Sequence, residues 1–119
     1  MEKILIIDDD DSTRESLTTY VRELGYTVFE ADNGLTGLEI IKKNIPDLVI
    51  SDIRMSGIDG IELSYIIKGL HHNLPVILLS CYDNDDLDLD KAFCFAFLQK
   101  PLNISDLRRN IGRALKKAA

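Results

Sequence analysis

The sequence predicts an α/β fold in which a five-stranded parallel sheet carries helices on both faces. Short aliphatic runs alternate with longer amphipathic stretches, and most runs are apolar at consecutive positions, as in strands buried on both sides. The chain has 119 residues, 45% of them hydrophobic, which is enough for one core. The alternation of strands and helices implies a doubly wound sheet with right-handed crossovers.

The predicted strands are the β-branched or aliphatic runs at residues 4–7, 27–31, 48–51, 76–79 and 95–98. Between the first two runs, Ser12 and Glu15 form a capping-box pattern, which predicts the start of the first helix. Gly25 predicts its end. The second helix is expected to begin near Asn33 and to bury Leu38 and Ile41 on one face.

Asp59 and Glu62 have the same capping-box spacing and predict the start of the third helix. The last helix is expected to start at Asn103 or Ser105. The interval at residues 83–92, where a fourth helix would lie, is rich in aspartate, a poor helix-interior residue. We therefore expect this segment to be short or mobile at rest.

Composition excludes several classes of protein. The formal charge of -6 disfavours direct binding to nucleic acid. No apolar run approaches the roughly 20 residues of a membrane span, so no membrane insertion is expected. The start of the sequence lacks a signal-peptide cleavage region, and Cys81 and Cys94 match no metal-binding spacing. These features favour a cytoplasmic domain with reduced cysteines.

Acidic residues follow two of the predicted strands directly. The first strand runs into the four aspartates at positions 8–11, and the third runs into Asp52. In a parallel sheet these strand ends share one edge, where function usually collects. Clustered carboxylates favour a shared cation, and Mg²⁺ prefers oxygen ligands. The alternative, for any single aspartate, is a simple preference for turns.

Two further strand ends complete this set. Ser80 follows the fourth strand, and Lys100, directly before Pro101, follows the fifth. A carboxylate nucleophile, a cation, a hydroxyl donor and an ammonium group are the parts that transfer of a phosphoryl group onto an aspartate needs.

These residues, with residues 4–9, the segment 51–60 and the Lys100-Pro101 pair, resemble the receiver domain of bacterial two-component response regulators. The resemblance covers the whole chain in the correct order. It implies one receiver domain over residues 1–119, with the flavodoxin-like strand order 2-1-3-4-5. It also implies a cytoplasmic switch in a phosphorelay.

The resemblance implies a role for each acidic residue. Asp52 matches the phosphoacceptor and is also a Mg²⁺ ligand. Asp9 is expected to bind Mg²⁺ directly and Asp8 through water, while Asp10 stays open as a substitute in the four-aspartate run. Arg54 is expected to offer its backbone carbonyl to the metal.

Other positions match the residues that sense and retain the phosphoryl group. Lys100 matches the lysine and Ser80 the hydroxyl of the site, while Phe97 matches the aromatic switch residue. Arg54 and Tyr82 flank the expected route of the attacking water and are expected to modulate the lifetime of the phosphate. The Lys100-Pro101 bond resembles the cis peptide of the family.

The implied function is acceptance of a phosphoryl group from the phosphohistidine of a sensor kinase or of a histidine phosphotransfer protein. The switch would then change the surface formed by residues 83–92, the last strand and the last helix. That surface would act on a downstream protein or on a tethered output domain, with homodimerisation on phosphorylation as one outcome. The sequence leaves open whether the chain is a stand-alone regulator or part of a longer protein.

Two other functions are compatible with parts of this pattern. One is a small Mg²⁺-dependent phosphohydrolase with an aspartyl nucleophile, but Arg54 stands where a second catalytic acid would be needed. The other is a pseudo-receiver that interacts without phosphorylation, which the complete set of site residues disfavours. We therefore expect no enzyme activity beyond assistance of the chain's own phosphorylation and dephosphorylation.

Overall fold

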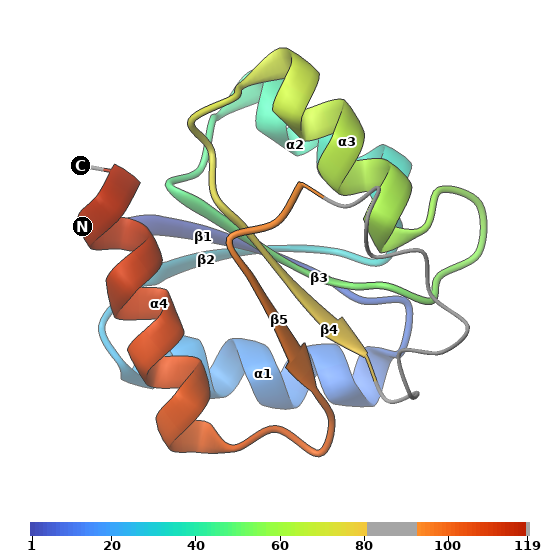
Figure 1. Ribbon diagram of the computed structural model, residues 1–119. Helices are drawn as coiled ribbons and strands as arrows, with labels where there is room; N and C mark the ends of the chain where they lie inside the picture. The colour runs from blue at the N-terminus through green and yellow to red at the C-terminus, as the bar shows by residue number, and fades with distance from the viewer. Residues whose placement is uncertain (81–92, 119) are drawn as a thin grey trace.

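The computed structural model describes residues 1–80 and 93–118, which form a parallel sheet with helices on both faces (Figure 1). The predicted strand order is confirmed as β2-β1-β3-β4-β5. The strands are β1 (Lys3–Ile7), β2 (Thr27–Ala31), β3 (Leu48–Asp52), β4 (Val76–Ser80) and β5 (Ala96–Gln99). Each predicted run lies within one residue of an observed strand at either end.

The register of the sheet aligns the carboxyl ends of its central strands. Ile7, the last residue of β1, lies beside Ser51 of β3, and Asp52 lies beside Leu79 of β4. Ser80 is paired in turn with Gln99 of β5. The residues that follow Ile7, Ser51, Leu79 and Gln99 therefore meet at one edge of the sheet.

The four helices of the described residues lie in two layers, with α1 (Asp11–Glu23) and α4 (Ile104–Ala118) on one face. The other face carries α2 (Gly34–Lys43) and α3 (Gly60–Leu70) (Figure 1). Each strand contributes side chains to the core on both faces of the sheet, because successive side chains point to opposite faces. In β1, Ile4 and Ile6 join the core under α1 and α4, whereas Leu5 and Ile7 join the core under α2 and α3.

Most of the predicted helix ends are confirmed. Asn33 caps α2, Asp59 caps α3, and each side chain accepts a hydrogen bond from the backbone N–H three residues later. Asn103, not Ser105, does the same for α4 by accepting from Asp106 at 3.1 Å. Gly25 has a φ of 104° and donates its N–H to Arg22, which ends α1 as predicted.

The predicted start of α1 at Ser12 is wrong. The cap is Asp10, whose carboxylate accepts from the Thr13 backbone at 2.9 Å and also from the Thr13 hydroxyl. Asp10 is extended, and the helix begins at Asp11. An aspartate caps a helix at least as well as serine. The helix therefore starts two residues earlier and includes Ser12.

The described residues do not include positions 81–92. The predictions made for Cys81, for Tyr82 and for the segment at residues 83–92 therefore stay predictions. Cys94 is half-buried and packs against the core under α2 and α3, where burial raises the pKa of its thiol. Within residues 1–80 and 93–118, no helix combines the length and the apolar character needed to cross a bilayer.

Candidate functional site

The end of β1 presents two aspartates in different environments. Asp8 is 2% exposed; its backbone N–H donates to the carbonyl of Ala31 at 3.1 Å. One of its carboxylate oxygens accepts from the backbone N–H of Asp10 at 3.0 Å. Asp9 is exposed. The inner carboxylate is therefore tied to the protein, and the outer one faces the solvent.

The end of β3 presents Asp52 beneath the start of α3. The backbone N–H of Gly60 donates to the carbonyl of Ile53 at 2.8 Å, which fixes the loop after Asp52. A Cβ at Gly60 would lie 2.8 Å from the Cα of Ile53 and would also overlap the carbonyl of Asp52. Only glycine lets α3 approach this strand end so closely.

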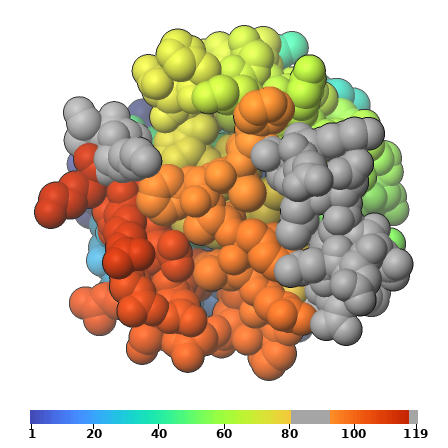
Figure 2. All heavy atoms as spheres, viewed as in Figure 1, coloured from blue at the N-terminus to red at the C-terminus, as the bar shows by residue number. Residues whose placement is uncertain are grey.

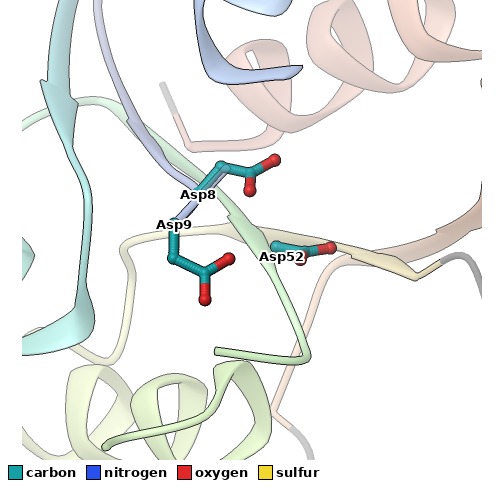
Figure 3. A group of neighbouring side chains, drawn as sticks. All are labelled: Asp8, Asp9 and Asp52. Atoms are coloured by element: carbon teal, nitrogen blue, oxygen red, sulfur yellow. The ribbon is translucent and has the colours of Figure 1, made fainter. Parts of the chain in front are cut away.

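Asp8, Asp9 and Asp52 converge at the edge of the sheet, as Figure 3 shows. One carboxylate oxygen from each lies within 4.8 Å of the others. Three hard oxygen donors at this spacing fit a divalent cation such as Mg²⁺. Asp10 is not part of the cluster, because its carboxylate caps α1. Of the four aspartates that follow β1, the structure thus groups Asp8 and Asp9 with Asp52.

Lys100 reaches the same cluster from the end of β5. Its ammonium lies 3.2 Å from Asp52 and 3.4 Å from Asp8, and its backbone N–H donates to the carbonyl of Ser80. The Lys100-Pro101 peptide is cis, as predicted. Burial alone would lower the pKa of Lys100, but the carboxylates of Asp52 and Asp8 outweigh it and raise that pKa above its ordinary value. Lys100 is therefore a cation at neutral pH.

Asp52 also has a raised pKa, but here the shift disfavours the charged form of the side chain. Burial penalises its charged form, the carboxylates of Asp8 and Asp9 add repulsion, and the attraction of Lys100 only partly offsets both. A second positive charge near Asp52 would remove this imbalance. The direction of this shift is compatible with a bound cation in addition to Lys100.

Ser80 and Phe97 lie on β4 and β5, the two strands that follow β3 in the sheet. Ser80 is 1% exposed at the end of β4. Phe97, paired with Leu78, is partly buried against the core under α2 and α3. Arg54 is exposed two residues after Asp52. The structure thus brings Asp8, Asp9, Asp52 and Lys100 together. It places Ser80 at the end of β4, the strand next to β3, and Phe97 on β5, the strand after that.

Sequence reasoning missed two residues that support the site, Gly60 and Arg14. Gly60 follows the predicted cap Asp59, so its position was visible, but its contact with the end of β3 was not. Arg14 donates to the backbone carbonyl of Asp8 at 2.7 Å. No spacing rule signals a contact between a side chain and the main chain six residues earlier.

A family model described as "Response regulator receiver domain" matches residues 4–112 of this chain. The chain is a response regulator receiver domain. The match includes the acidic cluster and the strands of the sheet, with β1 from Ile4 onward, and it confirms the resemblance noted in the sequence.

Two curated relatives are similar to nearly all of this chain but differ in how much of their own length it covers. It is 34% identical to sporulation initiation phosphotransferase F of Bacillus subtilis over 116 residues, which is 96% of this chain and 94% of that protein. It is 37% identical to the transcriptional regulatory protein ZraR of Klebsiella oxytoca over 94% of this chain, but over only 26% of that protein. The chain thus spans about a quarter of one relative and nearly all of the other.

Solved structures agree with the receiver fold. A receiver domain protein of Clostridium thermocellum has a TM-score of 0.89 and 29% identity, covering 98% of this chain and 96% of that chain. The response regulator TrrA of Thermotoga maritima, solved in complex with Mg²⁺-BeF, has a TM-score of 0.87 and 32% identity. That comparison covers 97% of this chain and 100% of that chain.

Proposed function

We propose that this receiver domain is a switch in which Asp52 accepts a phosphoryl group from a phosphohistidine. The observation that carries the proposal is the convergence of three carboxylates within 4.8 Å, with the Lys100 ammonium 3.2 Å from Asp52. The acceptor oxygen of Asp52 would form a bond to phosphorus while the bond from phosphorus to the histidine nitrogen breaks. The proposal is supported by TrrA, a similar response regulator that was solved in complex with Mg²⁺-BeF.

We assign the metal ligands as Asp9, Asp52 and the backbone carbonyl of Arg54, with Asp8 acting through water. Asp8 suits an indirect role because one oxygen accepts from Asp10 and the other lies 3.4 Å from Lys100. Asp9, being exposed, suits a direct role. When bound, Mg²⁺ would supply positive charge for the phosphoryl oxygens.

The remaining residues would hold the phosphoryl group and report its presence. Lys100 would exchange part of its contact with Asp52 for a phosphoryl oxygen, and the Ser80 hydroxyl would donate to another. The movement of Ser80 would be transmitted to Phe97 on β5. We propose that Arg54 and Tyr82 slow hydrolysis by shielding Asp52, although Tyr82 lies outside the described residues.

The partner that reads the switch would bind the surface around β5 and α4. Figure 2 shows the segment that contains β5 and the segment that contains α4 side by side on one face of the molecule. The helix that the sequence predicts at residues 83–92, between β4 and β5, would extend this surface. These residues lie outside the described part of the chain. A downstream protein, a tethered output domain or a second copy of the chain would each fit this role.

The phosphodonor would bind a different surface, between α1 and the loop that begins at Lys100. A groove of about 360 Å³ lies between α1 and the loop after β5, next to the site. Tyr20, Leu102 and Ile104 contribute apolar surface to it, and Lys100 and Pro101 form its edge. A sensor kinase or histidine phosphotransfer protein docked there would bring its phosphohistidine to Asp52.

The domain would act in the cytoplasm as a signalling component, with no enzyme activity beyond its own phosphorylation and dephosphorylation.

The test is labelling with a small-molecule phosphodonor, measured as intact mass. We expect the parent chain to gain one acid-stable, base-labile phosphoryl group only when Mg²⁺ is present. Asp52→Asn should gain none. Asp10→Asn is the matched control, because it removes a neighbouring acid but keeps a good helix cap, and it should be labelled like the parent. Equal labelling of Asp52→Asn would refute the proposal.

A further inference from the structure

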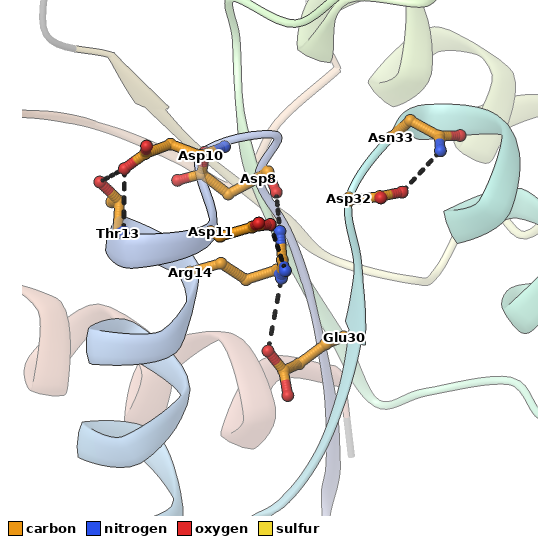
Figure 4. Close-up of polar contacts among 8 residues, drawn as sticks. All are labelled: Asp8, Asp10, Asp11, Thr13, Arg14, Glu30, Asp32 and Asn33. Carbon is orange, nitrogen blue, oxygen red and sulfur yellow. Dashed lines mark hydrogen bonds and ion pairs between the residues drawn. The ribbon is translucent and has the colours of Figure 1, made fainter.

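Arg14 binds the main chain between two of the clustered aspartates, Asp8 and Asp9. It lies near the start of α1, and its guanidinium turns back to donate to the backbone carbonyl of Asp8 at 2.7 Å. The same guanidinium lies 2.7 Å from Asp11 and 3.4 Å from Glu30 of β2 (Figure 4). Its side chain is only 16% exposed. Arg14 therefore joins α1, β2 and the turn after β1.

The position of Arg14 is unfavourable for a cation unless these contacts compensate. The first turn of a helix carries the positive end of the helix dipole, which favours acids and disfavours arginine. A planar guanidinium can satisfy several acceptors at fixed angles, and a lysine ammonium cannot do so equally well. Three acceptors from three elements converge on Arg14. The contacts thus stabilise a charge that the helix alone would repel.

The carbonyl of Asp8 belongs to the peptide that links Asp8 to Asp9. Fixing this peptide fixes the direction in which the Asp9 carboxylate leaves the chain. The carboxylate of Asp8 is already tied to Asp10 and Lys100, so the exposed Asp9 is the ligand most in need of support. We propose that Arg14 is a positioning residue that holds this peptide and so sets the affinity of the site for Mg²⁺. This inference rests on the proposed metal site.

Positioning and electrostatics predict opposite results for the loss of Arg14. If Arg14 acted only through its charge, its removal would relieve repulsion and strengthen the binding of a divalent cation. If it positions Asp9, its removal lets the turn relax and weakens the binding. Loss of an outer residue that orients a ligand typically lowers metal affinity by roughly 10-fold to 100-fold. The sign of the change therefore distinguishes the two.

The experiment is a titration of the unphosphorylated chain with Mg²⁺ alone, followed by NMR or calorimetry. Arg14→Gln should weaken Mg²⁺ binding by roughly tenfold. Arg14→Lys, which keeps the charge but not the fork of donors, should give a smaller loss in the same direction. Arg22→Gln is the matched control; Arg22 is an exposed cation of α1 that lies 3.9 Å from the same Glu30. It should bind Mg²⁺ as tightly as the parent or slightly more tightly.

A second measurement, amide hydrogen exchange without Mg²⁺, separates a local effect from a loss of fold. In Arg14→Gln we expect faster exchange at Asp9 and Asp10, with the protection of β3 and β4 unchanged. Unchanged or tighter Mg²⁺ binding in both Arg14 variants would overturn the inference, as would a loss of protection throughout the sheet. Failure of the proposed function is distinct, because the parent chain itself would then bind no Mg²⁺ and take no phosphoryl group on Asp52.

Discussion

Asp52 carries its charge where the surroundings oppose it, and this has a measurable effect on stability. Burial, and then the carboxylates of Asp8 and Asp9, raise its pKa above the ordinary value, with Lys100 only partly compensating. The folded chain therefore holds a proton at pH values where the unfolded chain has released it. The contribution of Asp52 to stability is thus full below the ordinary pKa and is lost as the pH rises through the folded value.

We therefore expect Asp52→Asn to stabilise the Mg²⁺-free chain at neutral pH by about 1 kcal/mol, a usual size for one residue. Urea unfolding would measure the difference, which should shrink as the pH falls toward the ordinary value of 3.8. Lys100 keeps its contact with Asp8 in this variant. Saturating Mg²⁺ should narrow or reverse the difference, because the parent retains the complete ligand set.

The exposed Glu39 on α2 provides the control, since Glu39→Gln removes the same charge far from this imbalance and should change stability little. Lower stability of Asp52→Asn than of the parent at neutral pH, without Mg²⁺, would contradict this account of the site's charges.

At the scale of elements, the contact between α3 and the end of β3 determines where Asp52 lies. Gly60 makes the contact possible, because a Cβ there would overlap the backbone of Asp52 and Ile53. Gly60→Ala should therefore destabilise the chain by about 2 kcal/mol, as overpacking typically does. It should also reduce phosphorylation, since backbone atoms of Asp52 and Ile53 must shift. Thermal unfolding and the labelling assay would measure the two effects.

Gly69, in the same helix, is the matched control for Gly60. A Cβ at Gly69 would meet nothing within 4 Å, so Gly69→Ala should stabilise α3 by roughly 0.5 to 1 kcal/mol through helix propensity alone. If Gly60→Ala were as stable as Gly69→Ala, the close approach of α3 to β3 would not exist in solution.

The sequence predicted elements well where one local signal dominated. The aliphatic runs marked all five strands, and single polar side chains marked the caps Asn33 and Asp59. The start of α1 was mispredicted because four aspartates and Ser12 all suit a cap, and only the fit of the turn to β1 selects Asp10. Tertiary geometry decides such cases, since local propensities are nearly equal.

At the scale of the whole molecule, the proposed switch must carry a signal across the sheet from Asp52 to β5 and α4. Ser80 is the first residue on that route, since it ends β4 beside Gln99 of β5. Binding of Mg²⁺ and beryllofluoride, a phosphoryl mimic, should shift NMR signals in β5 and α4 of the parent. In Ser80→Ala we expect the mimic to bind but most of these distant shifts to disappear.

Thr18→Ala is the control for this coupling. Thr18 is also buried, and its hydroxyl has no hydrogen-bond partner within the described part of the chain. Its loss removes a buried hydroxyl from α1 and should leave the coupling intact. Distant shifts of parental size in Ser80→Ala would show that the signal takes another route.

The location of the candidate site could be predicted from sequence because the polar residues that line it follow strands directly. Adjacency to a strand placed Asp8, Asp52, Ser80 and Lys100 at one edge as soon as the sheet was known to be parallel. The support from Arg14 and Gly60 could not be predicted, because it depends on contacts between elements. Residues 83–92 gave a weak signal, since their aspartates oppose a helix that the pattern of the fold calls for.

The central claim is that Asp52, of all the clustered acids, receives the phosphoryl group. Reduction of the phosphorylated chain with borohydride converts an aspartyl phosphate to homoserine, and peptide mass spectrometry then locates that residue. We expect homoserine at position 52 alone, and only after phosphorylation in the presence of Mg²⁺. Homoserine at position 8, 9 or 10, with aspartate intact at position 52, would contradict the account.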